Sequence, residues 1–221
     1  MMRTSLDEVI RERRSARKFL PDKPVPRQLL DEALELAMRA PSNSNTQPWH
    51  VFLATGGRRV RLIDALRAAV DANPPAIGSA GLPPRFAHLR RQTGALLYGT
   101  MGIAREDTQG RWNAQLRNWQ FFSAPVAGVV CMHRDFGNVD AIGVGMFLQT
   151  LLLALAERGI GSCVQVSIAL YPDVLREQLH IPDELTVLCG MSIGYADPSF
   201  AANHLDTPRN AVTQNVVFLD D

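Results

Sequence analysis

The sequence predicts an α+β fold, because helical and strand-like hydrophobic patterns occur in one chain without the regular alternation of a βαβ protein. Three apolar runs, at 49–54, 126–132 and 185–193, are typical of strands. With 221 residues and 46% hydrophobic side chains, the chain is long enough for one sizeable core. No internal repeat and no linker-like stretch divides it, so we expect a single domain over residues 1–221.

The predicted helices are marked by their ends. Ser5-Leu6-Asp7-Glu8 has the pattern of a capping box and starts the first helix, which ends near RERRS (11–15). Apolar residues at helical spacing predict further helices between Pro26 and Pro41 and over 59–72, 140–158 and 172–179, with Gly159 as a C-cap. The inward face of the 59–72 helix is expected to carry Val60, Ile63, Leu66 and Val70.

The remaining segments have weaker signals. Gly56-Gly57 is turn-like, 73–84 is a loop by its Pro and Gly content, and 85–122 is weakly helical and rich in aromatic residues. The segment GIGSCVQVS (159–167) follows the most apolar helix and receives no secondary-structure assignment. NVVFL (215–219) is expected to be a strand or an arm.

Composition excludes several classes of partner. A net charge of +1 provides no general attraction to nucleic acid or to an anionic membrane. The uncharged run 141–156, in the most apolar predicted helix, is shorter than the ~20 residues that span a bilayer, and the N-terminus lacks the apolar centre of a signal peptide. Cys131, Cys163 and Cys189 lie far apart, as in a reducing compartment. We therefore expect a cytoplasmic protein that binds neither nucleic acid nor membrane.

Several catalytic motifs are matched only in part. Gly190 to Gly194 fits GxSxG with Ser192 as a nucleophile, but that motif requires a helix directly after the strand, and Tyr-Ala-Asp-Pro follows instead. Small residues on a packed strand explain the pattern better, and a serine hydrolase stays a weak alternative. The glycines at 143–145 and 159–161 do not complete a GxGxxG, and no P-loop occurs. The five histidines lack metal-ligand spacing, so we expect no metal site.

An arginine cluster remains, with two possible explanations. Arg13, Arg14 and Arg17 surround Ser15 at the end of the first helix, where cations commonly offset the negative end of the helix dipole. Guanidinium groups and a serine hydroxyl are also the groups that bind phosphate oxygens. The Ser/Asn/Gln loop at 42–47 adds amide side chains that can recognise the edge of a flat heterocycle. The combination favours an anion site.

Five motifs together resemble the FMN-dependent nitroreductase family. They are RRSARKF (13–19), APSNSNTQPWHV (40–51), GIGSCVQVS (159–167), LTVLCGMSIGYADP (185–198) and TPRN (207–210). The resemblance covers nearly the whole chain in the expected order. It implies a three-layer α/β/α fold with a central, mostly antiparallel mixed sheet, a homodimer with an exchanged C-terminal arm, and FMN at the dimer interface. Residues 73–122 would be a helical insertion of variable length.

The resemblance also implies the residues of the site. Arg13 and Ser15 would bind the FMN phosphate, with Arg14 nearby and Arg209 completing the clamp from the tail, while Arg17 would reach the ribityl chain and the pyrimidine end of the ring. The partner subunit would contribute its own copies of Pro41, Ser42, Asn43, Asn45 and Gln47. The ring edge would lie along Val164, Gln165, Val166 and Ser167. Trp112, Phe121 and Phe122 would line the acceptor channel, or alternatively pack in the core.

The activity that the resemblance implies is a ping-pong, two-electron transfer of hydride from NAD(P)H to nitroaromatic compounds or quinones. FMN carries this chemistry, so no catalytic side chain is expected. Reductive dehalogenation, flavin fragmentation and non-catalytic flavin carriage stay open as alternatives within the resemblance. Neither the physiological acceptor nor the choice between NADH and NADPH follows from these motifs.

Overall fold

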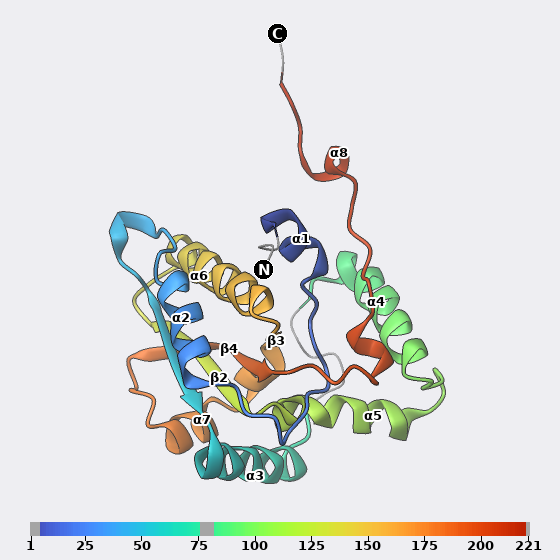
Figure 1. Cartoon of the computed structure of the whole chain (residues 1–221). Helices are drawn as coiled ribbons and strands as arrows, with labels where there is room; N and C mark the ends of the chain where they lie inside the picture. Colours follow the sequence, from blue (N-terminus) through green and yellow to red (C-terminus); the bar gives the residue numbers. More distant parts are fainter. Residues whose placement is uncertain (1–4, 76–81, 220–221) are drawn as a thin grey trace.

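The computed structural model describes residues 5–75 and 82–219, and it places one four-stranded sheet between two layers of helices (Figure 1). The strands are β1 (Trp49–Ala54), β2 (Val126–His133), β3 (Gly161–Gln165) and β4 (Leu185–Gly194). Their order in the sheet is β1-β2-β4-β3, and every neighbouring pair is antiparallel. The expected α+β class is confirmed.

The central strand β2 shows why the sheet is covered on both faces. Val126, Val130 and Met132 pack with α2 (Arg27–Ala37) and α6 (Asn138–Glu157), whereas the alternate residues Val129 and Cys131 belong to the opposite cluster. That second cluster contains α3 (Gly56–Ala72), α7 (Pro172–Leu179) and the 3-10 segment η3 (Arg117–Ser123). Since successive side chains of a strand point to opposite faces, a continuous apolar strand requires a helical layer on each side.

Strand β3 is the element that the sequence did not indicate. It is five residues long, and it pairs with β4 at the edge of the sheet. Ser15, just after α1 (Leu6–Glu12), forms a parallel bridge to Ser162 on its other side. This isolated bridge is a parallel contact beside an otherwise antiparallel sheet, and it brings the arginine-rich segment to the edge of the sheet.

The region 73–122 contains two helices, α4 (Ala87–Thr100) and α5 (Thr108–Leu116), preceded by the short segment η2 (Pro84–Phe86). Both helices lie to one side of the sheet layers in Figure 1. The loop expected at 73–84 falls partly on residues 76–81, outside the described residues. The remaining short elements are η1 (Asn43–Asn45), η4 (Val166–Leu170), η5 (Ala201–Asn203) and α8 (Val212–Asn215).

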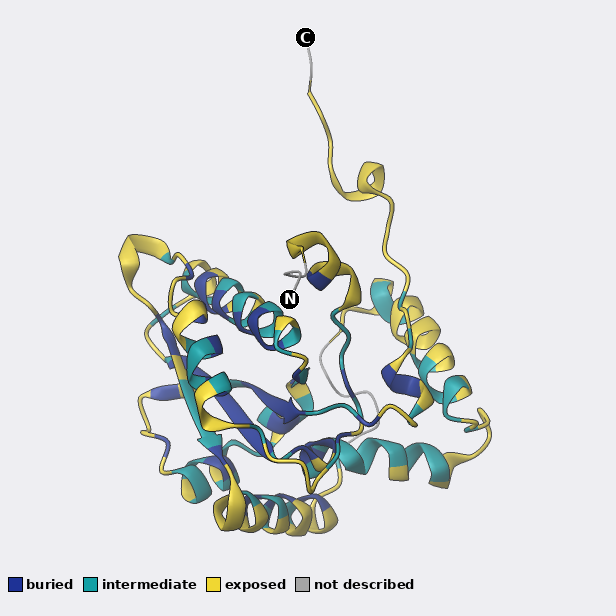
Figure 2. Ribbon diagram, viewed as in Figure 1, coloured by how far each residue is buried: buried dark blue, intermediate teal, exposed yellow. Residues whose placement is uncertain are grey.

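The C-terminal segment after residue 209 leads away from the rest of the chain (Figure 2). Its apolar side chains are exposed, from 46% at Val216 to 92% at Leu219. The expectation of a strand or an arm therefore resolves to an arm, since residues 215–219 join no strand among the described residues.

Two local expectations need correction. Helix α3 begins at Gly56, whose φ of +51° suits glycine, rather than after a Gly-Gly turn. Its buried residues are Leu62, Leu66 and Val70, while Val60 is 48% exposed, because the helix is rotated relative to the predicted face.

Helix α6 is the one helix among the described residues that is long and apolar enough to span a bilayer by length and composition alone. A helix in the core of a protein can be equally long and apolar. Phe147, Leu151 and Leu155 of α6 are buried against α2 and the sheet.

Candidate functional site

The segment Arg13–Phe19 crosses the edge of the sheet in an extended conformation. The N–H of Ala16 donates to the carbonyl of Ser162 on β3 (3.0 Å), and the N–H of Phe19 donates to the carbonyl of Phe122 (3.1 Å). Ala16 and Phe19 point inward and are 3% and 1% exposed. Ser15 and Arg17, which flank Ala16, are half-buried. The side chain of Ser15 forms a hydrogen bond with the thiol of Cys163 on β3.

Four arginines gather around this segment. Burial lowers the pKa of Arg13, and the nearby positive charges of Arg209 and Arg14 lower it further. Arg14 pairs with the exposed Asp206 at 3.6 Å, whereas Arg13 and Arg209 have no ion pair among the described residues. If Arg13, Arg14 and Arg17 only offset the dipole of α1, nothing explains why Arg209 joins them from the far end of the chain. The cluster has the charge of an anion site.

Cys163 lies behind these cations on β3. Burial raises the pKa of its thiol, while Arg17, a hydrogen bond with Ser15 and Arg13 act in the opposite direction. The thiol is 5% exposed. It contributes an apolar floor beneath the arginine segment and stays protonated.

The end of β3 is fixed from within the molecule. The hydroxyl of Ser192 on β4 donates to Oε1 of Gln165 at 2.5 Å, and Nε2 of Gln165 donates to the carbonyl of Asn118 at 2.9 Å. Nε1 of Trp119 donates to the carbonyl of Ser167 at 3.2 Å. Val166 is left outside this network and is 59% exposed. The backbone after β3 is therefore held in place, while the side chain of Gln165 faces inward.

The same network argues against a hydrolase at Ser192. Ser192 has no exposed surface and lies within β4, which continues to Gly194 without a turn into a helix. The hydroxyl of Ser192 donates to Gln165, and within residues 5–75 and 82–219 no histidine accepts a hydrogen bond from it. A nucleophile elbow requires an exposed serine at a strand-to-helix turn.

The loop Pro41–Gln47 forms a second polar surface. Ser44, Asn45 and Gln47 adopt positive φ values of 48°, 55° and 47°, which L-residues rarely adopt. The N–H of Gln47 donates to Oγ of Ser42 at 2.9 Å and fixes the turn from within. The side chains of Asn43, Asn45 and Gln47 are exposed. Strain held in an exposed amide-rich loop is typical of a binding surface.

Helix α6 separates this loop from the arginine cluster. Ser42 packs so closely on Gly143 that a Cβ added at Gly143 would lie 3.1 Å from that of Ser42. The cluster instead adjoins Ala156 and Glu157 at the other end of the helix. Thirteen residues at about 1.5 Å each place the two surfaces about 20 Å apart. Within one chain they do not form one site.

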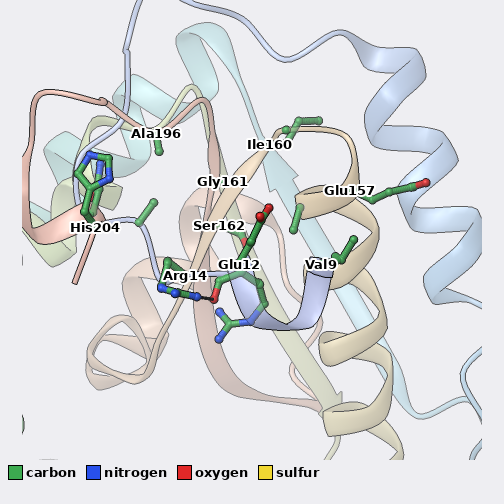
Figure 3. Close-up of a pocket in the computed structure, with 14 residues that line it drawn as sticks. Val9, Glu12, Arg14, Glu157, Ile160, Gly161, Ser162, Ala196 and His204 are labelled. Atoms are coloured by element: carbon green, nitrogen blue, oxygen red, sulfur yellow. Dashed lines mark hydrogen bonds between the residues drawn. The ribbon is translucent and has the colours of Figure 1, made fainter. Parts of the chain in front are cut away.

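A cavity lies between these C-terminal residues of α6 and the arginine segment (Figure 3). It has a volume of about 450 Å³. Glu12 and Arg14 lie on one side of it, Ser162 forms its floor, and His204 and Glu157 lie at its rim (Figure 3). Arg13 also lines it.

Comparison with known proteins identifies the fold and the family. A sequence profile described as the Nitroreductase family matches residues 10–195. The chain belongs to the nitroreductase family.

Individual relatives extend over the full length. A 4-nitrobenzoate reductase of Pseudomonas putida is 36% identical over 213 residues, covering 95% of this chain and 93% of that protein. A nitrobenzene nitroreductase of Ectopseudomonas oleovorans is 35% identical over 226 residues, covering 98% and 97%. The solved structure of the FMN-dependent nitroreductase NfnB from Mycobacterium smegmatis in complex with NADPH superposes with a TM-score of 0.89, at 33% identity and 97% coverage of both chains.

The three aromatic residues assigned to an acceptor channel differ in exposure. Phe121 has no exposed surface and Phe122 is 5% exposed, and both adopt positive φ in a turn that ends η3. Trp112 is half-buried and lies 6.5 Å from Trp119 between ring centroids. Phe121 is part of the core of this nitroreductase, whereas Phe122 reaches a small cavity beside Arg17.

Sequence reasoning missed the residues that hold the arginine segment. Asn203 binds the backbone of both Arg17 and Lys18, and Arg117 donates to the carbonyl of Arg17. Asn203 is 186 positions from Arg17, and neither Asn203 nor Arg117 lies in a recognisable motif. Only the fold brings them together.

Proposed function

We propose that the protein is an FMN-dependent NAD(P)H oxidoreductase that reduces nitroaromatic compounds and also quinones. The observation that carries the proposal is the arginine cluster. Arg13 is half-buried beside Arg14 and Arg209, and no carboxylate pairs with it among the described residues. A bound anion would stabilise such a cluster, and a phosphate dianion matches its charge.

The residues present fit FMN at both of its ends. Arg13, Arg14 and Arg209 would hold the phosphate together with the half-buried Ser15. Arg17 lies further along the same segment, where it would face the ribityl chain and the pyrimidine ring. The backbone of Val164–Ser167 would lie along the ring edge, and its anchoring by Ser192 and Trp119 supports that assignment because a rigid edge fixes the ring position.

A second copy of the chain would complete the site. Pro41, Ser42, Asn43, Asn45 and Gln47 expose polar groups that lie too far along α6 to meet the cofactor held by their own chain. We therefore propose a homodimer in which each protomer's loop faces the cofactor bound by the partner's arginines. The exposed arm 212–219 would wrap the partner, which accounts for its uncovered apolar side chains.

The chemistry that FMN supplies when bound is hydride transfer from NAD(P)H and, after exchange of substrates in a ping-pong cycle, to the acceptor. The protein's own groups bind and orient. Arg17 holds a fixed positive charge at the pyrimidine end, where negative charge develops on reduction, and this favours two-electron over one-electron transfer. No side chain of the site is required as a nucleophile.

Anaerobic mixing tests the proposal. The purified protein should be yellow and release FMN on denaturation. NADPH or NADH should bleach it, and adding 4-nitrobenzoate or a quinone should restore the colour with consumption of the acceptor. Bound flavin that neither reductant bleaches would contradict the oxidoreductase assignment and would favour a carrier. Bleaching with loss of the flavin itself would favour flavin fragmentation, and release of halide from a halogenated acceptor would favour dehalogenation.

A further inference from the structure

A second cavity lies beside Arg17, between α4, α5 and η3. Its volume is about 150 Å³, and an apolar cavity of roughly this size accommodates one benzene ring. Tyr98, Met101 and Phe122 supply aromatic and apolar surface. Asn118 adds an amide, and Arg17 and Arg117 add guanidinium groups. The lining therefore combines aromatic and apolar side chains with positively charged groups, around a space about the size of one aromatic ring.

Arg117 brings its charge to this cavity without a counter-ion. Its guanidinium donates to the carbonyl of Arg17 and lies against the ring of Phe200, 4.5 Å from the centroid. No carboxylate in residues 5–75 or 82–219 lies within ion-pairing distance of it. Burial lowers the pKa of Arg117, so the surroundings disfavour the uncompensated charge. With five N–H donors, a guanidinium held by one carbonyl retains donors for a ligand.

The surroundings reinforce the positive potential. None of the described residues that line the cavity is acidic. Arg111 of α5 stacks on the ring of Tyr98 at 4.8 Å and places a further cation beside the cavity wall. Half-buried arginines without carboxylates raise the local affinity for anions.

We propose that this cavity is a subsite for the acceptor's anionic substituent, in which Arg117 binds the carboxylate of an aromatic nitro acid such as a nitrobenzoate. The inference rests on the proposed function and narrows it to a charged class of substrate. A guanidinium binds a carboxylate through two parallel hydrogen bonds, while the rings of Tyr98 and Phe122 contact the aromatic ring. A neutral nitroarene leaves the charge of Arg117 uncompensated.

A preference for charged over neutral nitroarenes does not follow from the relatives, because a 4-nitrobenzoate reductase and a nitrobenzene nitroreductase are almost equally similar to the chain. The competing assignment is that Arg117 serves the cofactor or only the backbone of Arg17. The two assignments differ in which measurements respond to its replacement.

The test compares Arg117→Gln and Arg117→Lys with the wild-type holoenzyme. Arg59→Gln is the matched control, because Arg59 also donates to a backbone carbonyl, that of Ala124, but lies on α3 away from the cavity. Titration of the oxidised holoenzyme with benzoate and with benzamide measures binding without turnover. Steady-state kinetics then give kcat/KM for 4-nitrobenzoate and for nitrobenzene, and rapid mixing gives the rate of reduction by NADPH.

We expect wild-type protein to bind benzoate more tightly than benzamide and to prefer 4-nitrobenzoate. Arg117→Gln should lower benzoate affinity and the ratio of the two kcat/KM values by about 10- to 100-fold, the usual effect of one charge-assisted pair. Arg117→Lys should restore part of it, and Arg59→Gln should stay near wild-type. Because Arg117 also holds the backbone of Arg17, any change in the rate of NADPH reduction should affect both nitroarenes equally and cancel in the ratio. Equal losses on both nitroarenes, or equal affinities for benzoate and benzamide, would overturn the subsite. Wild-type protein that reduces neither nitroarene would contradict the proposed function, while benzoate binding still decides the subsite.

Discussion

Asn203 fixes the backbone of Arg17 from the opposite end of the chain. Its Oδ1 accepts from the N–H of Arg17 at 2.7 Å, and its Nδ2 donates to the carbonyls of Lys18 and Asp197 at 2.8 and 2.9 Å. Asn203 is 8% exposed, so these bonds have little competition from water. The C-terminal turn therefore holds the arginine segment in its extended conformation.

Replacing Asn203 with Ala should weaken FMN binding as well as the fold. Loss of three hydrogen bonds should lower the free energy of unfolding by about 2–4 kcal/mol. Without Asn203 the backbone of Arg17 would have to become ordered when FMN binds, and this entropy cost should lower FMN affinity by about 10-fold. Arg176→Met is the control, since Arg176 binds the carbonyls of Pro182 and Leu185 at the far end of the sheet. Equal FMN affinities for the two variants would show that Asn203 serves stability alone.

Arg13→Ala should remove one charged contact to the cofactor phosphate. We expect FMN affinity to fall by about 1.5–3 kcal/mol, measured by fluorescence titration of the apoprotein. Arg11→Ala removes a neighbouring charge that is 78% exposed and pairs with Asp7 within α1. If both variants bind FMN like the wild type, Arg13 is only a helix-end charge.

Stability should fall in strong acid through Asp197. Hydrogen bonds from Ser199 and then Lys18 lower its pKa from 3.8 to about 2. A depressed folded-state pKa contributes stability above the ordinary pKa, and this contribution is lost as the pH falls from 3.8 towards 2. Denaturant unfolding across this window should show a steeper loss for wild-type protein than for Asp197→Asn. Parallel curves would mean that Asp197 does not contribute to the acid sensitivity.

Ser192→Ala should keep most of the nitroreductase activity. The hydroxyl orients Gln165, so its loss leaves Oε1 of Gln165 without a donor and should cost about 1–3 kcal/mol of stability. Activity per bound FMN, measured below the unfolding temperature, separates the two effects. Abolished reduction in a folded, FMN-loaded variant would place Ser192 in the chemistry.

The sequence predicted the elements whose patterns are local. The capping box at Ser5, the helix over 172–179 and strands β1, β2 and β4 all occur where their periodicity or caps indicate. Strand β3 was missed because a five-residue edge strand beginning with glycine has too few residues to show alternation. The rotation of α3 was missed because Val60, Leu62, Ile63 and Leu66 allow two overlapping apolar faces.

The residues of the candidate site also fall into two groups: those that a local motif predicts and those that only the fold brings together. Motif resemblance predicted Arg13, Ser15, Arg17 and Arg209 as site residues, and the fold brings Arg209 near Arg13. The supporting residues Asn203 and Arg117 contact the segment only through tertiary structure, at separations of 186 and 100 residues from Arg17. Contacts at such distances leave no periodic or capping signal in one sequence.

Mixed dimers test most directly whether the site is built from two copies of the chain. One protomer would carry Arg13→Ala with Ser15→Ala, and the other Asn43→Ala with Asn45→Ala, each with a different affinity tag. In a mixed dimer one site then has both defects and the other has none. We predict that purified mixed dimers bind FMN at half of their sites with wild-type affinity and regain about half of the wild-type activity, while both parent homodimers bind FMN weakly. Mixed dimers no better than the mean of their parents would contradict a shared site.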